Sequence, residues 1–300
     1  DRQDQLASLI AILMLASWLF LVLESAFNQR LARGFGIELP GWLARFVTQM
    51  IHQQSLFFVL PFFAMSTTWN SGQLLFTSLL GAAALVSIID PLYYDWLAPR
   101  RWLYLAYHSL TLFAVMLTAM PIILHLTTPQ SYQLALLLTV LLSFPTLAAS
   151  LQFRRRWRWL ALPLLTAGLL GAGWLARPWV PPATLRLNQV AISLEVNDQT
   201  RAPSRSLQQL SAAQLRNHGL YAFTAINAPR GLAERIYHVW KRDGQEVDRI
   251  ALNIQGGSNS GYRAWSHKLN FPQEVTGRWS VEVVTEAGQL IGVLRFAVGP

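Results

Sequence analysis

Two histidines, three carboxylates and a tyrosine in the first 110 residues have the side-chain types most suited to chemistry. They are Glu24, His52, Asp90, Asp95, Tyr104 and His108. Tyr104 and His108 are four residues apart, so they share one face of a helix. Neutral imidazole and carboxylate bind divalent metals, which makes His52, Asp90 and His108 a candidate metal site. A proton relay or a site for a polar head group would use the same residue types.

The same residues also have an explanation that involves no site. Carboxylates near a membrane interface can reach water or pair with arginines, and His52 can form a hydrogen bond between helices. The spacing matches no recognised metal motif, since the sequence has neither HExxH nor a repeated carboxylate-x-x-His. We therefore expect no cofactor, keep a divalent metal as the alternative, and assign no catalytic residue.

A second group of interest is aromatic and lies in the last third of the chain. Tyr237, Trp240 and Tyr262 are candidate surface residues that would stack on a sugar or dock a protein. Trp265 and Trp279 are expected in a core instead, because large aromatics dominate such cores. The sequence contains no cysteine, which excludes disulfides and thiolate metal sites.

The elements that must position the first group are six apolar segments of membrane-helix length. They cover about 8–27, 46–68, 73–92, 102–126, 131–150 and 159–176. Nine of the eleven arginines up to residue 178 fall in the connections after the first, third and fifth segments. Because arginine-rich loops stay in the cytoplasm, residues 1–178 are predicted to form a six-helix transmembrane bundle with the C-terminal part outside.

The rest of the chain has the alternating pattern of β-strands. A proline-rich linker over 179–184 leads into seven strand-like runs between residues 185 and 300, and SAAQLRNH predicts a short helix among them. Asp243-Gly244 between two such runs is typical of a two-residue hairpin turn. Residues 185–300 are therefore predicted to form an all-β antiparallel sandwich, Ig-like in shape.

Composition agrees with this division. The chain is 53% hydrophobic and only 13% charged, about half the charge of an average soluble domain. Its net charge of +9 is spread along the chain, with eleven arginines against six acids up to residue 178 and thirteen basic against nine acidic residues beyond it. No basic run stands out, so nucleic acid is not an expected partner.

Several segments resemble a known but uncharacterised architecture. IYHVWKRDGQEVDRIAL, YRAWSHKLNF and GRWSVEVVTEAGQLIGVLRFAV resemble a C-terminal domain found in bacterial membrane proteins of unknown function, over roughly 185–300. HQQSLFFVLPFF and DPLYYDW resemble the membrane region that accompanies that domain. The resemblance implies a multi-pass inner-membrane protein with a periplasmic Ig-like domain, and it implies no activity.

Two functions from different classes follow from these residues. The first is a binding or scaffold protein whose periplasmic domain engages an envelope partner, either a membrane-protein complex or a glycan, while the helices contact membrane lipid. The alternative is a transporter or metal-dependent enzyme that uses the polar cluster at the cytoplasmic end of the first four helices. Convergence of His52, Asp90 and His108 around a cavity would favour the alternative.

Overall fold

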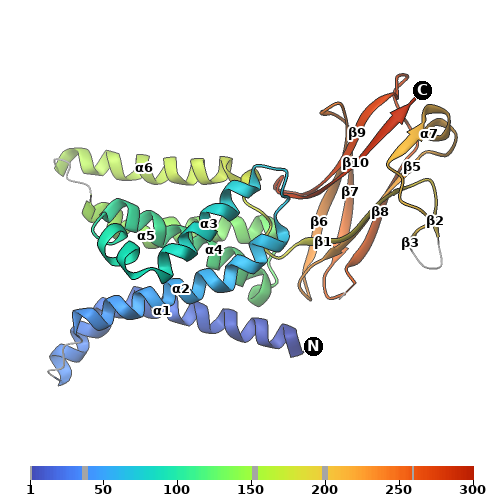
Figure 1. The fold of residues 1–300 in the computed structure, drawn as a ribbon. Coiled ribbons are helices and arrows are strands. Elements are labelled where there is room, and N and C mark those ends of the chain that lie inside the picture. The colour runs from blue at the N-terminus through green and yellow to red at the C-terminus, as the bar shows by residue number, and fades with distance from the viewer. Residues whose placement is uncertain (1, 36–39, 151–154, 198–201, 259) are drawn as a thin grey trace. The chain divides into compact units, whose positions relative to one another are not determined.

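The computed structural model describes all residues except 1, 36–39, 151–154, 198–201 and 259 (Figure 1). Side chains at 2–4, 22–35, 145–150 and 155–159 also lie outside the description. The chain divides into two compact units. Unit 1 comprises Asp1–Ala64, Leu75–Leu124 and Gln130–Ala176, and unit 2 comprises Met65–Leu74, His125–Pro129 and Arg177–Pro300.

Unit 1 is helical, and a helix covers each of the six apolar segments. The helices are α1 (Arg2–Phe35), α2 (Gly41–Ser66), α3 (Gln73–Ile88), the π-helical turn η1 (Pro91–Leu97), α4 (Arg101–Leu124), α5 (Thr128–Ser150) and α6 (Arg155–Leu175). α4 contributes much of the interior, with Leu105, Leu112 and Val115 among its buried residues, and it packs against α1. Leucine-rich segments with little glycine favour helix, which is why these boundaries follow the apolar runs closely.

The prediction that unit 1 is a six-span membrane bundle is wrong. Among the described residues, one helix, α4, is long and apolar enough to cross a membrane, or two if α3 and η1 are counted as one bent span. Polar residues between Gln49 and Gln54 interrupt the apolar run of α2. The described apolar parts of α1 and α6, Gln5–Leu21 and Leu160–Leu175, are shorter than a full span. Apolar composition predicted the helices but overstated their capacity to cross a bilayer.

Unit 2 is rich in β-structure. After the 3-10 turn η2 (Arg177–Trp179) come β1 (Arg186–Ser193), β2 (Val196–Asn197), β3 (Ala202–Pro203), β4 (Gln209–Ser211), α7 (Ala212–His218), β5 (Leu220–Asn227), β6 (Ala233–Arg242), β7 (Gln245–Gln255), β8 (Tyr262–Lys268), β9 (Gly277–Thr285) and β10 (Leu290–Gly299). The predicted helix is confirmed as α7, and Ser211 caps it by accepting a hydrogen bond from the Gln214 backbone N–H.

The described strands form three sheets. Their orders are β1-β5-β8, β4-β10-β9-β6-β7 and β2-β3. The prediction of an all-antiparallel, Ig-like sandwich is wrong, because β4 pairs in parallel with β10. One apolar core contains residues from both larger sheets, including Ile226 of the first and Trp240, Val281 and Phe296 of the second.

The β6–β7 hairpin confirms the turn predicted from sequence. Asp243 and Gly244 form its two-residue loop with φ values of 48° and 86°, so both lie in the left-handed region. Asp243 also accepts a hydrogen bond from the backbone N–H of Arg278 at 3.1 Å, which ties the hairpin to the start of β9. Asp-Gly suits this turn because Gly, and to a lesser degree Asp, tolerates positive φ.

Candidate functional site

A hydrogen-bonded chain of four side chains lies inside unit 1. Tyr104 and His108 come from α4, Tyr93 from η1 and His52 from α2. The Tyr104 and Tyr93 hydroxyls are 3.4 Å apart, and the Tyr93 hydroxyl is 2.8 Å from His52 Nδ1. His52 Nε2 then lies 2.9 Å from His108 Nδ1. Three elements, α2, η1 and α4, therefore bring their polar side chains into one hydrogen-bonded chain.

The chain is enclosed by packed aromatic and polar side chains. His52 is fully buried, and Trp18 of α1 packs against both histidine rings, with ring centroids 5.6 Å from His52 and 4.8 Å from His108. Trp18 Nε1 donates a hydrogen bond to Ser55 Oγ at 2.9 Å, and the Tyr107 ring meets the His52 ring edge-on. Both ring nitrogens of His52, the Tyr93 hydroxyl and the Trp18 N–H therefore have partners, as burial requires.

The geometry is consistent with two neutral imidazoles. A neutral imidazole has one N–H donor and one acceptor nitrogen. If the Tyr93 hydroxyl donates to His52 Nδ1, then His52 Nε2–H donates to His108 Nδ1. If His108 Nδ1–H donates to His52 Nε2 instead, then His52 Nδ1–H donates to the Tyr93 hydroxyl, and the same contacts are satisfied. Both nitrogens of His52 are therefore in use, so that ring cannot coordinate a metal without breaking a buried hydrogen bond.

The structure brings only part of the predicted cluster together. His52, Tyr104 and His108 converge, but Asp90 is exposed and accepts a hydrogen bond from Gln49 Nε2 at 2.7 Å. Asp95 is exposed, and the side chain of Glu24 lies outside the described residues. Within the described part of the chain, no three His, Asp or Glu side chains gather as metal ligands. The proposed ligand set of His52, Asp90 and His108 is not assembled.

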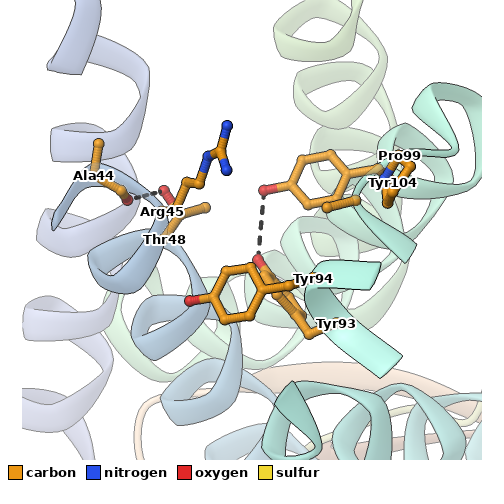
Figure 2. Close-up of a pocket in the computed structure, with 8 residues that line it drawn as sticks. Ala44, Arg45, Thr48, Tyr93, Tyr94, Pro99 and Tyr104 are labelled. Carbon is orange, nitrogen blue, oxygen red and sulfur yellow. Dashed lines mark hydrogen bonds between the residues drawn. The ribbon is translucent and has the colours of Figure 1, made fainter. Parts of the chain in front are cut away.

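A pocket adjoins the hydrogen-bonded chain and shares two of its residues. Its volume is about 460 Å³, and Figure 2 shows its lining: Ala44, Arg45, Thr48, Tyr93, Tyr94, Ala98, Pro99 and Tyr104. The Tyr93 and Tyr104 hydroxyls belong both to the pocket wall and to the chain that leads to His52. A ligand in this pocket would thus meet one end of the histidine–tyrosine chain.

Sequence reasoning missed three residues of this region. Trp18 and Ser55 were read only as parts of apolar segments, and Tyr93 only as part of the DPLYYDW run. A tyrosine pair between two acidic residues is a signal for polar burial, because a tyrosine in an apolar segment needs a partner for its hydroxyl. That signal does not identify which residue is the partner. The packing of α2 against η1 provides it.

The candidate surface aromatics of unit 2 do not form an exposed platform. Trp240 is fully buried in the core, so its assignment to a binding surface is wrong. Strand alternation places it on the inner face of β6. Tyr237 is half-buried with the Arg249 guanidinium 5.6 Å above its ring, and Tyr262 is half-buried against the core. Trp279 lies in the core as predicted.

A second buried histidine, unanticipated from sequence, lies in that core. His238 Nδ1 is 2.9 Å from Ser266 Oγ, and its Nε2 is 3.2 Å from Thr224 Oγ1. Trp240 Nε1 donates to the same Ser266 hydroxyl. Burial lowers the pKa of His238 to about 3, so the ring is neutral and ties β6 to β5 and β8. This arrangement is enclosed by the core, so we assign it a structural role.

Comparisons with known proteins add family membership but no activity. A model described as "Family of unknown function (DUF5924)" matches residues 1–222, and one described as "Protein of unknown function (DUF2914)" matches residues 233–298. None of the curated proteins matches the sequence. The chain is similar to the solved structure of Pseudomonas fluorescens alkylpurine DNA glycosylase AlkC bound to DNA containing an abasic site analog. That similarity has 13% identity and a TM-score of 0.25 over 99% of this chain and 97% of that chain, which is too low to indicate a shared fold.

Proposed function

The chain belongs to the family of unknown function DUF5924, and we propose that it is a membrane-associated binding protein. Its helical unit 1 takes a small polar ligand into the pocket of Figure 2. Unit 2 is then an accessory domain rather than the binding part.

One observation carries this proposal: the buried histidine–tyrosine chain ends in the wall of a pocket. His52 and Tyr93 are buried and Tyr104 and His108 are half-buried, and withdrawing polar side chains from water costs free energy that a purely apolar interior would avoid. Here those side chains run from His108 and His52 to the two tyrosine hydroxyls that line the pocket. A pocket of about 460 Å³ falls in the range that small-molecule ligands occupy. Converging polar groups in such a pocket are typical of a binding site.

Exposed apolar side chains on unit 1 support membrane association. Leu13 of α1, Leu75 of α3 and Leu164 of α6 are 58%, 72% and 75% exposed. Large exposed apolar surface indicates contact with lipid or with a partner. Helix α4 has the length and composition of a membrane span, which favours lipid.

The scaffold function expected for unit 2 has weaker support. Its premise was an exposed aromatic surface on the β-strands, and Trp240, the largest member of that set, is in the core. Tyr237 and Tyr262 are half-buried and belong to different sheets, on β6 and β8. The pocket of unit 1 offers a defined cavity with polar groups, so we propose it as the ligand-binding site instead.

Native mass spectrometry of the full-length protein in mild detergent tests the proposal. We expect the wild-type protein to retain a bound molecule on the order of a few hundred daltons, the size that fits such a pocket. Ala44→Trp places a large side chain in the pocket wall and should remove that adduct. Leu75→Trp, on an exposed helix position outside the pocket, should keep it. Absence of an adduct from the wild type, or its retention in Ala44→Trp, would overturn the proposal.

A further inference from the structure

The polar groups around the pocket point to a class of ligand, and this inference rests on the proposed function. We propose that the ligand carries a phosphate or phosphodiester group, bound by Arg45 together with the hydroxyls of Tyr94 and Tyr104. These three side chains come from α2, η1 and α4, so their donors approach from three separate elements.

The charge of the lining is the first step. Arg45 is the one cation among the lining residues, and no carboxylate lines the pocket. Among the described residues, no ion pair joins Arg45 to an Asp or Glu, and the Asp90 carboxylate accepts a hydrogen bond from Gln49 Nε2. Figure 2 shows the Arg45 side chain and the Tyr104 hydroxyl turned toward one another across the pocket. A cation beside hydroxyl donors favours an anionic ligand.

The backbone adds to this positive potential. Ala44, Arg45 and Thr48 lie in the first two turns of α2, and Pro99 and Tyr104 flank the first turn of α4. The N-terminal ends of two helices therefore border the same pocket. Each carries a partial positive charge from its aligned peptide dipoles, which stabilises a bound anion.

The distribution of donors favours a tetrahedral anion over a carboxylate. A planar carboxylate is satisfied by the two parallel N–H groups of a single arginine. Here the lining residues Arg45, Tyr94 and Tyr104 come from three different elements. A phosphate has oxygens pointing in several directions, so it can use donors that come from three elements at once.

Exposed tryptophans near the pocket indicate where such a phosphate would come from. Trp42, Trp96 and Trp102 are 69%, 45% and 52% exposed, and each precedes a lining residue by two positions. Exposed tryptophans are enriched at the level of lipid head groups. A lipid head group and a free phosphate compound share the same chemistry at Arg45, so the test separates these two sources.

The test uses the full-length protein stripped of bound molecules and mixed with defined probes in phosphate-free detergent. The probes are phosphatidylglycerol, diacylglycerol with the same acyl chains, and inorganic phosphate. Binding is measured by native mass spectrometry and by the thermal unfolding midpoint. We expect phosphatidylglycerol to bind and diacylglycerol to bind at least about tenfold more weakly, because charge-assisted hydrogen bonds contribute that much affinity.

Arginine variants complete the design. Arg45→Gln should weaken phosphatidylglycerol binding about tenfold or more, whereas Arg101→Gln, an exposed arginine outside the lining, should bind as the wild type does. Competition by inorganic phosphate, lost in Arg45→Gln, would assign the site to free phosphates. The phosphate inference is overturned if diacylglycerol binds equally well or if Arg45→Gln retains full binding of both phosphate probes. An adduct that is blocked by Ala44→Trp but contains no phosphorus would overturn this inference alone and leave the proposed function intact.

Discussion

His52 satisfies both of its ring nitrogens inside the protein, which limits what it can do. Its partners are the Tyr93 hydroxyl and His108 Nδ1, at 2.8 and 2.9 Å. Removing one partner leaves the other buried polar group unpaired, which costs about 1–3 kcal/mol. The four side chains of the chain should therefore act as one energetic unit rather than as independent residues.

A double-mutant cycle tests this coupling. His52→Phe removes the imidazole that contacts the Tyr93 hydroxyl and His108 Nδ1, and His108→Phe leaves His52 Nε2 without its partner. We expect the double variant to lose about 1 kcal/mol less unfolding free energy than the two single losses combined. Unfolding in mixed micelles, followed by tryptophan fluorescence, gives the values. The control cycle pairs His52→Phe with Ser109→Ala, whose hydroxyl bonds Ser143 instead, and should be additive.

His238 repeats the pattern of a buried neutral histidine in a setting without a pocket. His238→Ala removes the partner of Ser266 and Thr224 and leaves a cavity between two sheets. We expect unit 2 to lose about 2–5 kcal/mol of unfolding free energy. Hydrogen exchange of β5 and β6 amides in the full-length protein measures the loss. His218→Ala, at an exposed position in α7, should change stability by less than about 0.5 kcal/mol.

Among the elements, η1 decides where the site's tyrosines lie. α3 ends at Ile88, and the axis bends by 101° before η1 begins at Pro91. Proline has no backbone N–H to donate into the helical ladder, which favours a break at this point. The turn places Tyr93 inside, where it is 2% exposed, and leaves Asp90 outside against Gln49. This break separates Asp90 from the histidines with which it was grouped.

The β6–β7 turn offers a direct test of backbone conformation. Gly244 has a φ of 86°, and a Cβ added there would meet no atom within 4 Å. Gly244→Ala should therefore destabilise unit 2 by about 1–2 kcal/mol through backbone strain alone. Gly244→Asn should cost less, because asparagine tolerates the left-handed region. Equal losses in the two variants, measured by urea unfolding, would contradict this explanation.

Local signals predicted local features and failed where partners were distant. The Asp243-Gly244 turn and α7 with its Ser211 cap were predicted correctly, because each depends on a few adjacent residues. The alternating pattern did not indicate β4, yet Gln209–Ser211 pairs with Ala297–Gly299. Three residues show no alternation, and their partner is almost ninety residues away, so nothing local indicated a parallel pair.

For the molecule as a whole, the candidate site was likewise predictable only where it depends on residues close together in the sequence. The four-residue spacing of Tyr104 and His108 correctly placed them on one helix. Their approach to His52 depends on the packing of α2 against α4, and the pocket depends on η1 as well. Hydrophobic composition likewise predicted where helices form, but it could not reveal that α2 buries Gln49 and His52 among its apolar residues.

Two buried ionisable groups in unit 2 should give its stability an unusual pH profile. The pKa of His238 is lowered by burial from 6.5 to about 3, so its contribution is complete above pH 6.5 and is lost as the pH falls toward 3. Burial raises the pKa of Glu234 from 4.5 to about 7 despite two hydrogen bonds from Thr128. Ionisation of Glu234 therefore lowers stability as the pH rises from 4.5 to 7.

These opposing effects should cancel between about pH 4.5 and 6.5, because each group changes stability by about 1.4 kcal/mol per pH unit. Stability of the wild type should be flat in that window and fall on both sides. Glu234→Gln removes the loss of stability that accompanies ionisation of Glu234. The stability of this variant should therefore decline as the pH drops below 6.5. His238→Asn removes the loss of stability that accompanies protonation of His238. The stability of this variant should therefore rise as the pH falls from 7 to 4.5. Urea unfolding of the full-length protein, followed by exchange of β6 amides, measures all three profiles. Parallel profiles for the two variants would show that neither group has the burial-shifted pKa on which the argument depends.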